Sequence, residues 1–181
     1  MLFADGAAFM ASDKKIKKVN KIIYNEIKRV SQWLTTNKLT LNKKKTKFMI
    51  FCNKREGKMV KIIKKFKINI NNYCIEQVHE FKYLGVVFNS KLDWHSHLEY
   101  LSTKIAKGSG VIRRLKYDLP IKVLKLIYHS LVESHLRFGI ISWGTAKSAA
   151  LKTLTSIQNR LIKSLCPSTF SLDQAYAHLR R

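Results

Sequence analysis

The sequence predicts an α+β fold, with a small antiparallel sheet and a covering helix over residues 1–91, followed by an all-α subdomain over residues 92–166. Two patterns support this prediction. In the first part, short β-prone stretches separated by turn residues flank one long amphipathic segment. In the second part, apolar residues recur at three- and four-residue steps. The 46% hydrophobic content of the 181 residues is enough to supply a core.

The chain begins with a predicted hairpin and a long helix. The Asp5-Gly6 pair lies between apolar residues and predicts two short strands within residues 1–12. Asp13 is the expected N-cap of a helix that ends near Asn37. The apolar positions that define this helix are Ile16, Val19, Ile22, Ile23, Ile27, Val30, Trp33 and Leu34. We expect the helix to cover one side of the sheet.

Short strands and then helices follow. Further strands are expected at residues 46–52, 66–70, 73–78 and 81–88. After residue 92 the apolar repeats predict three helices, which end before Pro120, near His135 and at Pro167. We expect residues 167–181 to be a frayed tail.

The chain is strongly basic. Its 35 Lys and Arg residues against 11 Asp and Glu residues give a formal net charge of +24. Such a charge favours a polyanionic partner through counterion release and long-range attraction, and nucleic acid is the first candidate. Most of the basic residues are lysines, and Lys, Asn and Ile all have A/T-rich codons. A biased base composition of the genome is therefore a second explanation for part of the charge.

The cysteines and the apolar runs argue against several classes of protein. Cys52, Cys74 and Cys166 are odd in number and far apart, which favours a reduced intracellular protein without a structural zinc site. The choice between nucleus and cytoplasm stays open. Asp5 interrupts the N-terminal apolar residues and the lysines follow them, which is the wrong order for a signal peptide. No apolar run approaches the roughly 18 residues that a membrane span needs.

Four motifs follow one another in a specific order. They are FADG at residues 3–6, SQWLTTNKLTLN at 31–42, KKTKFMIF at 44–51 and FKYLGVVFNSKLDWHSHL at 81–98. Their order and spacing resemble the reverse transcriptase of non-LTR (LINE-like, jockey-like) retrotransposons over essentially the whole chain. The resemblance implies that residues 1–91 are the C-terminal part of a polymerase palm and that residues 92–166 are thumb-like.

The FADG motif matches the palm hairpin that binds catalytic metal ions in this family. Asp5 matches the first aspartate of the family's pair, and Gly6 stands where the second belongs. The resemblance implies Mg²⁺ as cofactor and Asp5 as the remaining catalytic metal ligand, with an ion that this chain does not hold tightly. Phosphoryl transfer assisted by two metals usually needs several carboxylates. Taken alone, Asp5 is more often a turn residue.

A basic run matches the palm motif that follows the long helix. Lys45 and Thr46 match the family's Lys-Thr, which makes Lys45 a candidate contact for the departing pyrophosphate. The neighbouring candidates for phosphate contact are Lys43, Lys44 and Lys47. A solvated basic run without a specific role is the alternative for any one of these lysines.

The KYLG motif matches the hairpin that abuts the primer end in the family. It makes Tyr83, Leu84 and Gly85 candidate nucleic-acid contacts, and a glycine would let a nucleic-acid backbone approach closely. An ordinary strand glycine at a bulge is the alternative for Gly85. In the thumb-like part the candidate contacts are Lys104, Lys107, Arg113 and Arg114.

Two histidines beside Asp93 suggest a metal site at first sight. His95 and His97 flank Ser96, but no further ligand cluster accompanies them. A helix start with Asp93 as N-cap is the favoured interpretation. Trp94 and Trp143 are expected to anchor a core or an interface.

The resemblance predicts a truncated, degenerate relative of an RNA-directed DNA polymerase that is inactive alone. Its expected partners are an RNA/DNA primer–template duplex and the front half of the polymerase, if that half is encoded separately. One alternative is a basic nucleic-acid-binding module without catalysis, which would bind largely without sequence preference. A second is a decayed element copy without selected activity.

Overall fold

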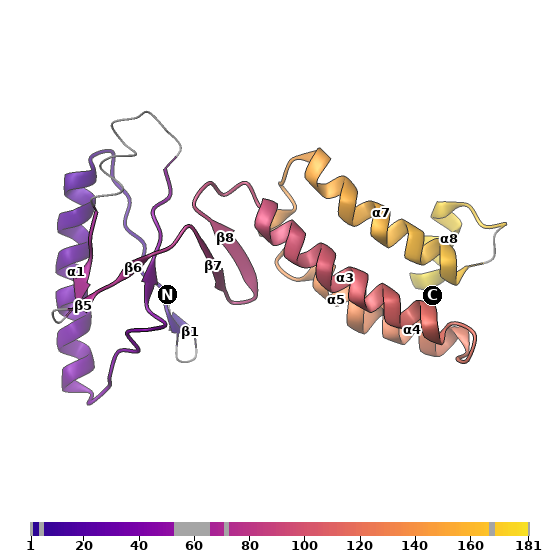
Figure 1. Ribbon diagram of the computed structural model, residues 1–181, viewed down its shortest axis with the longest axis horizontal. Helices are drawn as coiled ribbons and strands as arrows, with labels where there is room; N and C mark the ends of the chain where they lie inside the picture. Colours follow the sequence, from indigo (N-terminus) through magenta and orange to yellow (C-terminus); the bar gives the residue numbers. More distant parts are fainter. Residues whose placement is uncertain (1, 4–5, 53–65, 71–72, 167–168, 181) are drawn as a thin grey trace. The chain divides into compact units, whose positions relative to one another are not determined.

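The computed structural model describes residues 2–3, 6–52, 66–70, 73–166 and 169–180 (Figure 1). The chain divides into two compact units, Met1–Val78 and His79–Arg181, called unit 1 and unit 2 below. Helices and short strand pairs occur together, which is compatible with the predicted α+β class. None of the helices in the described ranges is both long and apolar enough to cross a membrane.

Unit 1 begins with a hairpin and a long helix. Strand β1 (Leu2–Phe3) pairs antiparallel with β2 (Gly6–Ala7), as predicted, and Gly6 lies in the strand opposite Phe3. Helix α1 covers Ile16–Thr36. The N-cap is Lys15 and not the predicted Asp13, which lies two residues earlier and accepts the Lys15 backbone N–H at 2.8 Å.

The strands of unit 1 are short and form separate pairs. Strand β3 (Lys47–Phe48) pairs in parallel with β6 (Glu76–Gln77), and β4 (Asn69–Ile70) pairs antiparallel with β5 (Tyr73–Cys74). The prediction of one small antiparallel sheet is therefore wrong for β3 and β6. Parallel pairing joins segments that are distant in sequence. The alternation of apolar and polar residues within one segment does not indicate which distant segment it pairs with.

The core of unit 1 is small. Six of the eight predicted apolar residues of α1 are half-buried, Ile22 and Trp33 are exposed, and none of the helix's side chains is fully buried. Ile68 and Ile75 are the buried apolar residues among the described part of this unit. Large apolar side chains such as Met10 and Trp33 are exposed. Most of the stability of a helix in a protein comes from burying its apolar face, and less comes from intrinsic helix propensity. The small core of unit 1 therefore stabilises α1 only weakly.

Unit 2 combines one hairpin with a helical bundle. The hairpin is formed by β7 (Glu80–Tyr83) and β8 (Val86–Asn89). The helical elements are α3 (His95–Leu115), α4 (Ile121–Tyr128), η1 (His129–Glu133), α5 (Ser134–Arg137), α6 (Ile140–Trp143), α7 (Ser148–Leu165) and α8 (Leu172–Arg180). The three predicted helices correspond to α3, to α4 through α5, and to α7.

The core of unit 2 lies where α3 packs against α7 (Figure 1) and where α3 packs against η1. Ile105, Ile112, Val132 and Ile162 are fully buried there. A close approach between helices occurs at Gly108 of α3, where a Cβ would lie 3.0 Å from the Leu131 carbonyl oxygen. The bundle therefore depends on a small residue at one point and on large aliphatic residues elsewhere.

Residues that were expected to fray form a helix instead. Ala175 and Leu179 of α8 are buried in the core of unit 2. Ser171 Oγ accepts the Gln174 N–H at 3.2 Å, and Gln174 Oε1 accepts the Ser171 N–H at 2.8 Å. This reciprocal pair is a capping box, a start signal that is readable in the sequence as Ser-x-x-Gln.

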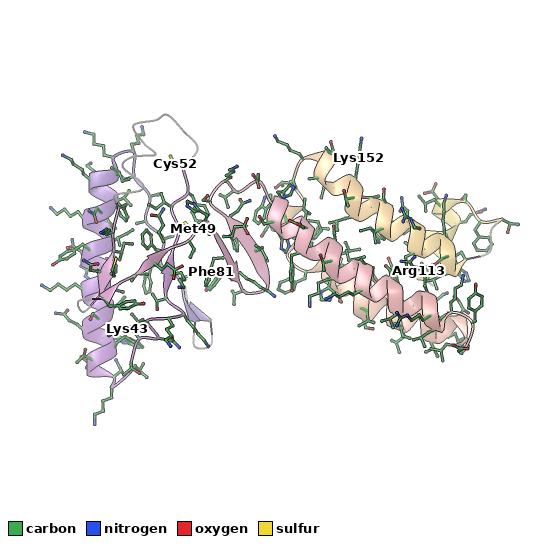
Figure 2. All side chains as sticks on the ribbon, viewed as in Figure 1. Lys43, Met49, Cys52, Phe81, Arg113 and Lys152 are labelled. Atoms are coloured by element: carbon green, nitrogen blue, oxygen red, sulfur yellow. The ribbon has the colours of Figure 1, made fainter. Side chains whose placement is uncertain are left out.

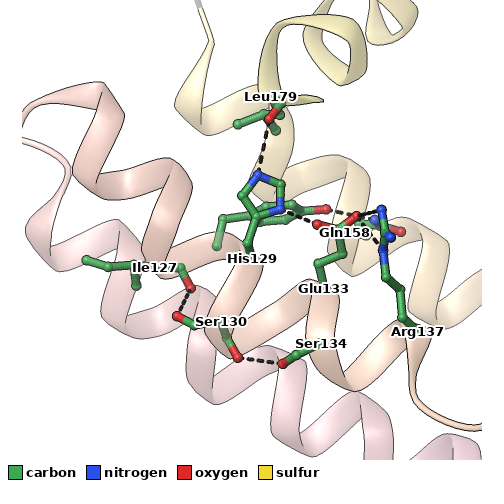
Figure 3. Close-up of polar contacts among 9 residues, drawn as sticks. Ile127, His129, Ser130, Glu133, Ser134, Arg137, Gln158 and Leu179 are labelled. Atoms are coloured by element: carbon green, nitrogen blue, oxygen red, sulfur yellow. Dashed lines mark hydrogen bonds and ion pairs between the residues drawn. The ribbon is translucent and has the colours of Figure 1, made fainter. Parts of the chain in front are cut away.

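The C-terminal end of α8 is fastened to the middle of the bundle (Figure 3). Lys125 Nζ donates to the His178 carbonyl at 2.6 Å, and His129 Nε2 donates to the Leu179 carbonyl at 3.2 Å. Both bonds satisfy carbonyls that the end of a helix leaves without partners. A polar network thus joins α8 to α4 and η1.

The same network surrounds a partly buried carboxylate. Glu133 pairs with His129 and with Arg137, whose Nη2 lies 2.7 Å from Oε1 (Figure 3). Burial acts to raise the pKa of Glu133, but the hydrogen bonds from His129 and Arg137 outweigh it and hold the pKa below its usual value. Glu133 ends η1, a single π-turn in which the Ser134 N–H bonds the His129 carbonyl.

Candidate nucleic-acid interface

The β7–β8 hairpin contains the predicted residues Tyr83, Leu84 and Gly85. Leu84 (φ 47°) and Gly85 (φ 83°) form its two-residue loop. Positive φ at both central residues is typical of a type I′ turn, in which glycine is favoured. Gly85 is therefore a turn residue and not a bulge, and Tyr83 has its hydroxyl buried without a hydrogen-bond partner in the part of the chain that is described.

The hairpin is bound to the first turns of α3. His97 Nδ1 accepts the Val87 backbone N–H at 3.2 Å, and Ser96 Oγ donates to the Glu80 carboxylate. His97 is only 1% exposed and lies against the rings of Trp94, Tyr100 and Trp143. Burial, helped by the charge of Lys82, lowers the pKa of His97. A neutral His97 therefore joins hairpin and helix.

The start of α3 agrees only in part with the interpretation favoured from the sequence, because Trp94 (φ 64°), and not the predicted Asp93, is the N-cap of the helix. Asp93 accepts the His95 backbone N–H at 3.1 Å and the Asn89 side-chain N–H at 2.5 Å. The Asn89 bond, followed by the His95 bond, lowers the pKa of Asp93. His97 faces the core. The pair His95 and His97 thus helps to build the hairpin–helix junction, and no metal role is assigned to it.

One exposed face of α3 forms a row of basic side chains. Lys107 comes three residues after Lys104, and Arg114 comes seven residues after Lys107. This spacing places the three side chains on one side of the helix. Tyr100 begins this row one turn before Lys104. Arg113 lies beside the row, and its Nε donates to the Ser109 carbonyl at 3.4 Å (Figure 2). Three predicted residues are thus gathered on one surface.

A lysine from the hairpin extends the row. Lys82 Nζ donates to Tyr100 Oη at 2.8 Å, and Lys104 Nζ lies 5.7 Å from the centre of the same ring. This bond from Lys82 lowers the pKa of Tyr100. We call Lys82, Lys104, Lys107 and Arg114 the basic stripe. Within the described ranges none of the four forms an ion pair with a carboxylate.

Sequence reasoning missed Lys82 and Tyr100. Tyr100 was detectable, because it lies four residues before Lys104 and seven before Lys107. Lys82 is part of KYLG, but its contact with α3 depends on how the hairpin packs and not on any local pattern.

The lysine run of unit 1 precedes and enters β3. Asn42 Oδ1 accepts the Lys45 backbone N–H at 3.1 Å, and the Lys45 side chain is exposed. Lys43 Nζ lies 5.6 Å from the centre of the Tyr73 ring (Figure 2). Lys47 pairs with Glu76 across β3 and β6, so its charge is engaged within the protein. Lys43, Lys44 and Lys45 have no such carboxylate partner among the described residues.

The predicted metal ligand lies outside the described residues. This ligand is Asp5, and its neighbour Gly6 has no side-chain oxygen to offer an ion. Over the described ranges, no three His, Cys, Asp or Glu side chains gather as a metal site. Mg²⁺ therefore finds no fitting set of donors among them, and we assign no chemical step to it.

Comparisons with known proteins show similarity of the chain to polymerases of mobile elements. No family model and no solved structure matches it. The chain is similar to RNA-directed DNA polymerases of non-LTR retrotransposons, which confirms the resemblance of its motifs.

The polymerase of the mobile element jockey from Drosophila melanogaster is 24% identical over 168 residues, 90% of this chain and 17% of that protein. The Pol polyprotein of the type-1 retrotransposable element R1 2 from Nasonia vitripennis is 28% identical over 116 residues, 62% of this chain and 27% of that protein. A probable polymerase from the Drosophila melanogaster X-element is 25% identical over 140 residues, 75% of this chain and 14% of that protein. The chain thus spans about a quarter or less of these relatives.

Proposed function

We propose that this chain forms the part of a retrotransposon reverse transcriptase that holds a nucleic-acid duplex, and that it does not catalyse nucleotide transfer alone. Residues 1–91 would be palm and residues 92–166 thumb-like. The basic stripe is the single observation that carries the proposal. Four cations without a carboxylate partner repel one another, and a line of phosphates would neutralise them.

The names of the relatives support the same partner. An RNA-directed DNA polymerase acts on a primer–template duplex, and its expected cofactor is Mg²⁺. Lys82, Lys104, Lys107 and Arg114 would contact phosphates, and Lys43, Lys44 and Lys45 of unit 1 would add further contacts. Contacts of this kind position a nucleic acid without reading its sequence. Binding should therefore depend strongly on salt and weakly on sequence.

Neutralising the stripe should weaken binding and its salt dependence. For an RNA–DNA duplex, log K falls as log salt rises, and each lysine that binds a phosphate makes this fall steeper by about one. We expect the variant Lys82→Gln/Lys104→Gln/Lys107→Gln to reduce the steepness by about 3. Fluorescence anisotropy at several salt concentrations measures this slope.

A charge-matched variant serves as the control. Lys147, Lys152 and Lys163 are exposed lysines beside or within α7, and changing all three to glutamine removes the same charge. This control should keep a slope close to that of the wild type. Equal slopes for the two variants would show that total charge, and not the stripe, governs binding.

The isolated chain should not extend a primer. With poly(rA)/oligo(dT), dTTP and Mg²⁺ or Mn²⁺, we expect no incorporation, because Gly6 cannot supply a ligand and each 1.4 kcal/mol of lost transition-state stabilisation slows a reaction about tenfold. An active retroviral reverse transcriptase is the positive control. Robust incorporation by this chain would contradict the proposed lack of activity.

A further inference from the structure

A phenylalanine ring occupies the tip of the β7–β8 hairpin. Gly85 has φ +83°, and a Cβ at this position would lie 2.8 Å from Cε1 and 3.3 Å from Cζ of Phe138. The ring therefore fills the space that a side chain at residue 85 would need. This contact joins the hairpin to the segment between α5 and α6.

The backbone around Phe138 is held on both sides. Its N–H bonds the Ser134 carbonyl at 3.1 Å, and its carbonyl accepts the Trp143 Nε1–H at 2.9 Å. The next residue, Gly139, has φ +64°, and a Cβ there would lie 3.1 Å from Cγ2 of Val86. The backbone that carries the Phe138 ring is thus held in place. Less conformational entropy of this segment is therefore lost when a ligand binds to the ring.

Phe138 is nevertheless not a core residue. It is 54% exposed, Leu84, which precedes Gly85 in the hairpin loop, is 39% exposed, and Ile141 is 92% exposed. We call Leu84, Phe138, Ile140 and Ile141 the tip patch. All four lie at or within three residues of the contact between Gly85 and Phe138, and neighbouring exposed apolar residues mark interaction sites on soluble proteins. A fixed aromatic ring adds a flat face on which another ring can stack.

We propose that the tip patch stacks on an unpaired base of the nucleic acid that the basic stripe holds, an inference that rests on the proposed function. Charge identifies the partner. Lys82, a member of the basic stripe without a carboxylate partner among the described residues, lies in the same hairpin as Leu84, whereas the charge of Arg137, directly before Phe138, is engaged by Glu133. A chain of charge +24 repels a second copy of itself and attracts a polyanion.

The stacking chemistry points to unpaired bases and not to continuous duplex. Every base has an aromatic face, and a base stacked on a protein ring binds without sequence preference. Bases inside a duplex already stack on their neighbours, so their faces are covered. The stripe would therefore hold the phosphates of the duplex, and Phe138 would mark a position where pairing ends.

Two oligonucleotides of equal length test this proposal. One is an RNA–DNA duplex with a single-stranded extension, and the other is fully paired with its ends closed by linkers. We expect the full-length chain to bind the first about tenfold more tightly, as one stacked base would give. In the Phe138→Ala variant this preference should disappear while binding to the closed duplex is kept, and Phe138→Tyr should retain it.

A matched variant and a folding-independent readout complete the test. Tyr117 is an aromatic residue of unit 2 that is 83% exposed, and Tyr117→Ala should leave the preference unchanged. With the wild-type chain, 2-aminopurine placed at the first unpaired position should lose fluorescence on binding. Equal affinity for the two oligonucleotides, a preference that survives Phe138→Ala, or a dimer that depends on Phe138 would each overturn the inference. If the wild-type chain bound neither oligonucleotide, this result would instead overturn the proposed function.

Discussion

Replacing Trp143 by alanine will destabilise unit 2 by about 3–5 kcal/mol, the usual cost of removing a buried aromatic residue. Trp143 is 3% exposed, its ring centre lies 5.9 Å from that of His97, and its Nε1 donates to the Phe138 carbonyl. The substitution would leave a cavity and an unpaired carbonyl together. Chemical denaturation followed by circular dichroism at 222 nm measures the free energy of unfolding.

Two comparison variants separate these causes. Trp143→Phe keeps most of the ring but loses the N–H donor, and it should cost less than Trp143→Ala. Trp33→Ala removes an exposed ring of unit 1 and should change stability by less than about 1 kcal/mol. A similar loss for Trp33→Ala and Trp143→Ala would contradict the assignment of Trp143 to the core.

Alanine at position 108 should destabilise the protein, whereas alanine two residues later should stabilise it. At Gly108 the new Cβ would lie 3.0 Å from the Leu131 carbonyl oxygen and 3.2 Å from Cγ2 of Val132. Overpacking of this kind costs about 1–3 kcal/mol. At Gly110 nothing lies within 4 Å, so the better helix propensity of alanine should raise stability by up to about 1 kcal/mol.

The two glycines are a close pair for comparison, because both lie in the same helix and receive the same methyl group. Thermal unfolding of the two variants should therefore give shifts of opposite sign. If Gly108→Ala is as stable as Gly110→Ala, then α3 and η1 are not packed at contact distance.

The parts of the fold that sequence reasoning predicted well are those set by local periodicity. Ile105 and Ile112 fall on one face of α3, and both are buried as their spacing predicted. Residues 81–88 were expected to form one strand, but Leu84 and Gly85 divide them into β7 and β8, whose register pairs Tyr83 with Val86. The resemblance of KYLG to a hairpin of the family implied this turn, whereas the buried face of α3 followed from residues that are near in sequence.

The remaining features depend on contacts between distant residues. The parallel pairing of β3 with β6 joins segments that are about thirty residues apart. The basic row of α3 could be read from the sequence, but its extension by Lys82 could not, because the hairpin must first pack on the helix. Likewise, nothing near Gly85 indicates that a ring from residue 138 will cover it. Like Tyr100, α8 was missed despite a local signal, the capping box of Ser171 and Gln174.

The π-turn at His129–Glu133 has a consequence for the position of Phe138. Each residue turns an α-helix by about 100°, and a π-turn takes up one more residue than an α-turn does. Ser134–Arg137 and the ring after them therefore reach the hairpin with an angular setting that the extra residue determines. Deleting one residue within η1 would convert the π-turn into an α-turn and leave Phe138 facing Gly85, whereas deleting one residue from the regular helix α4 would turn Phe138 away by about 100°. The tip patch thus depends on the number of residues before it as well as on their identity.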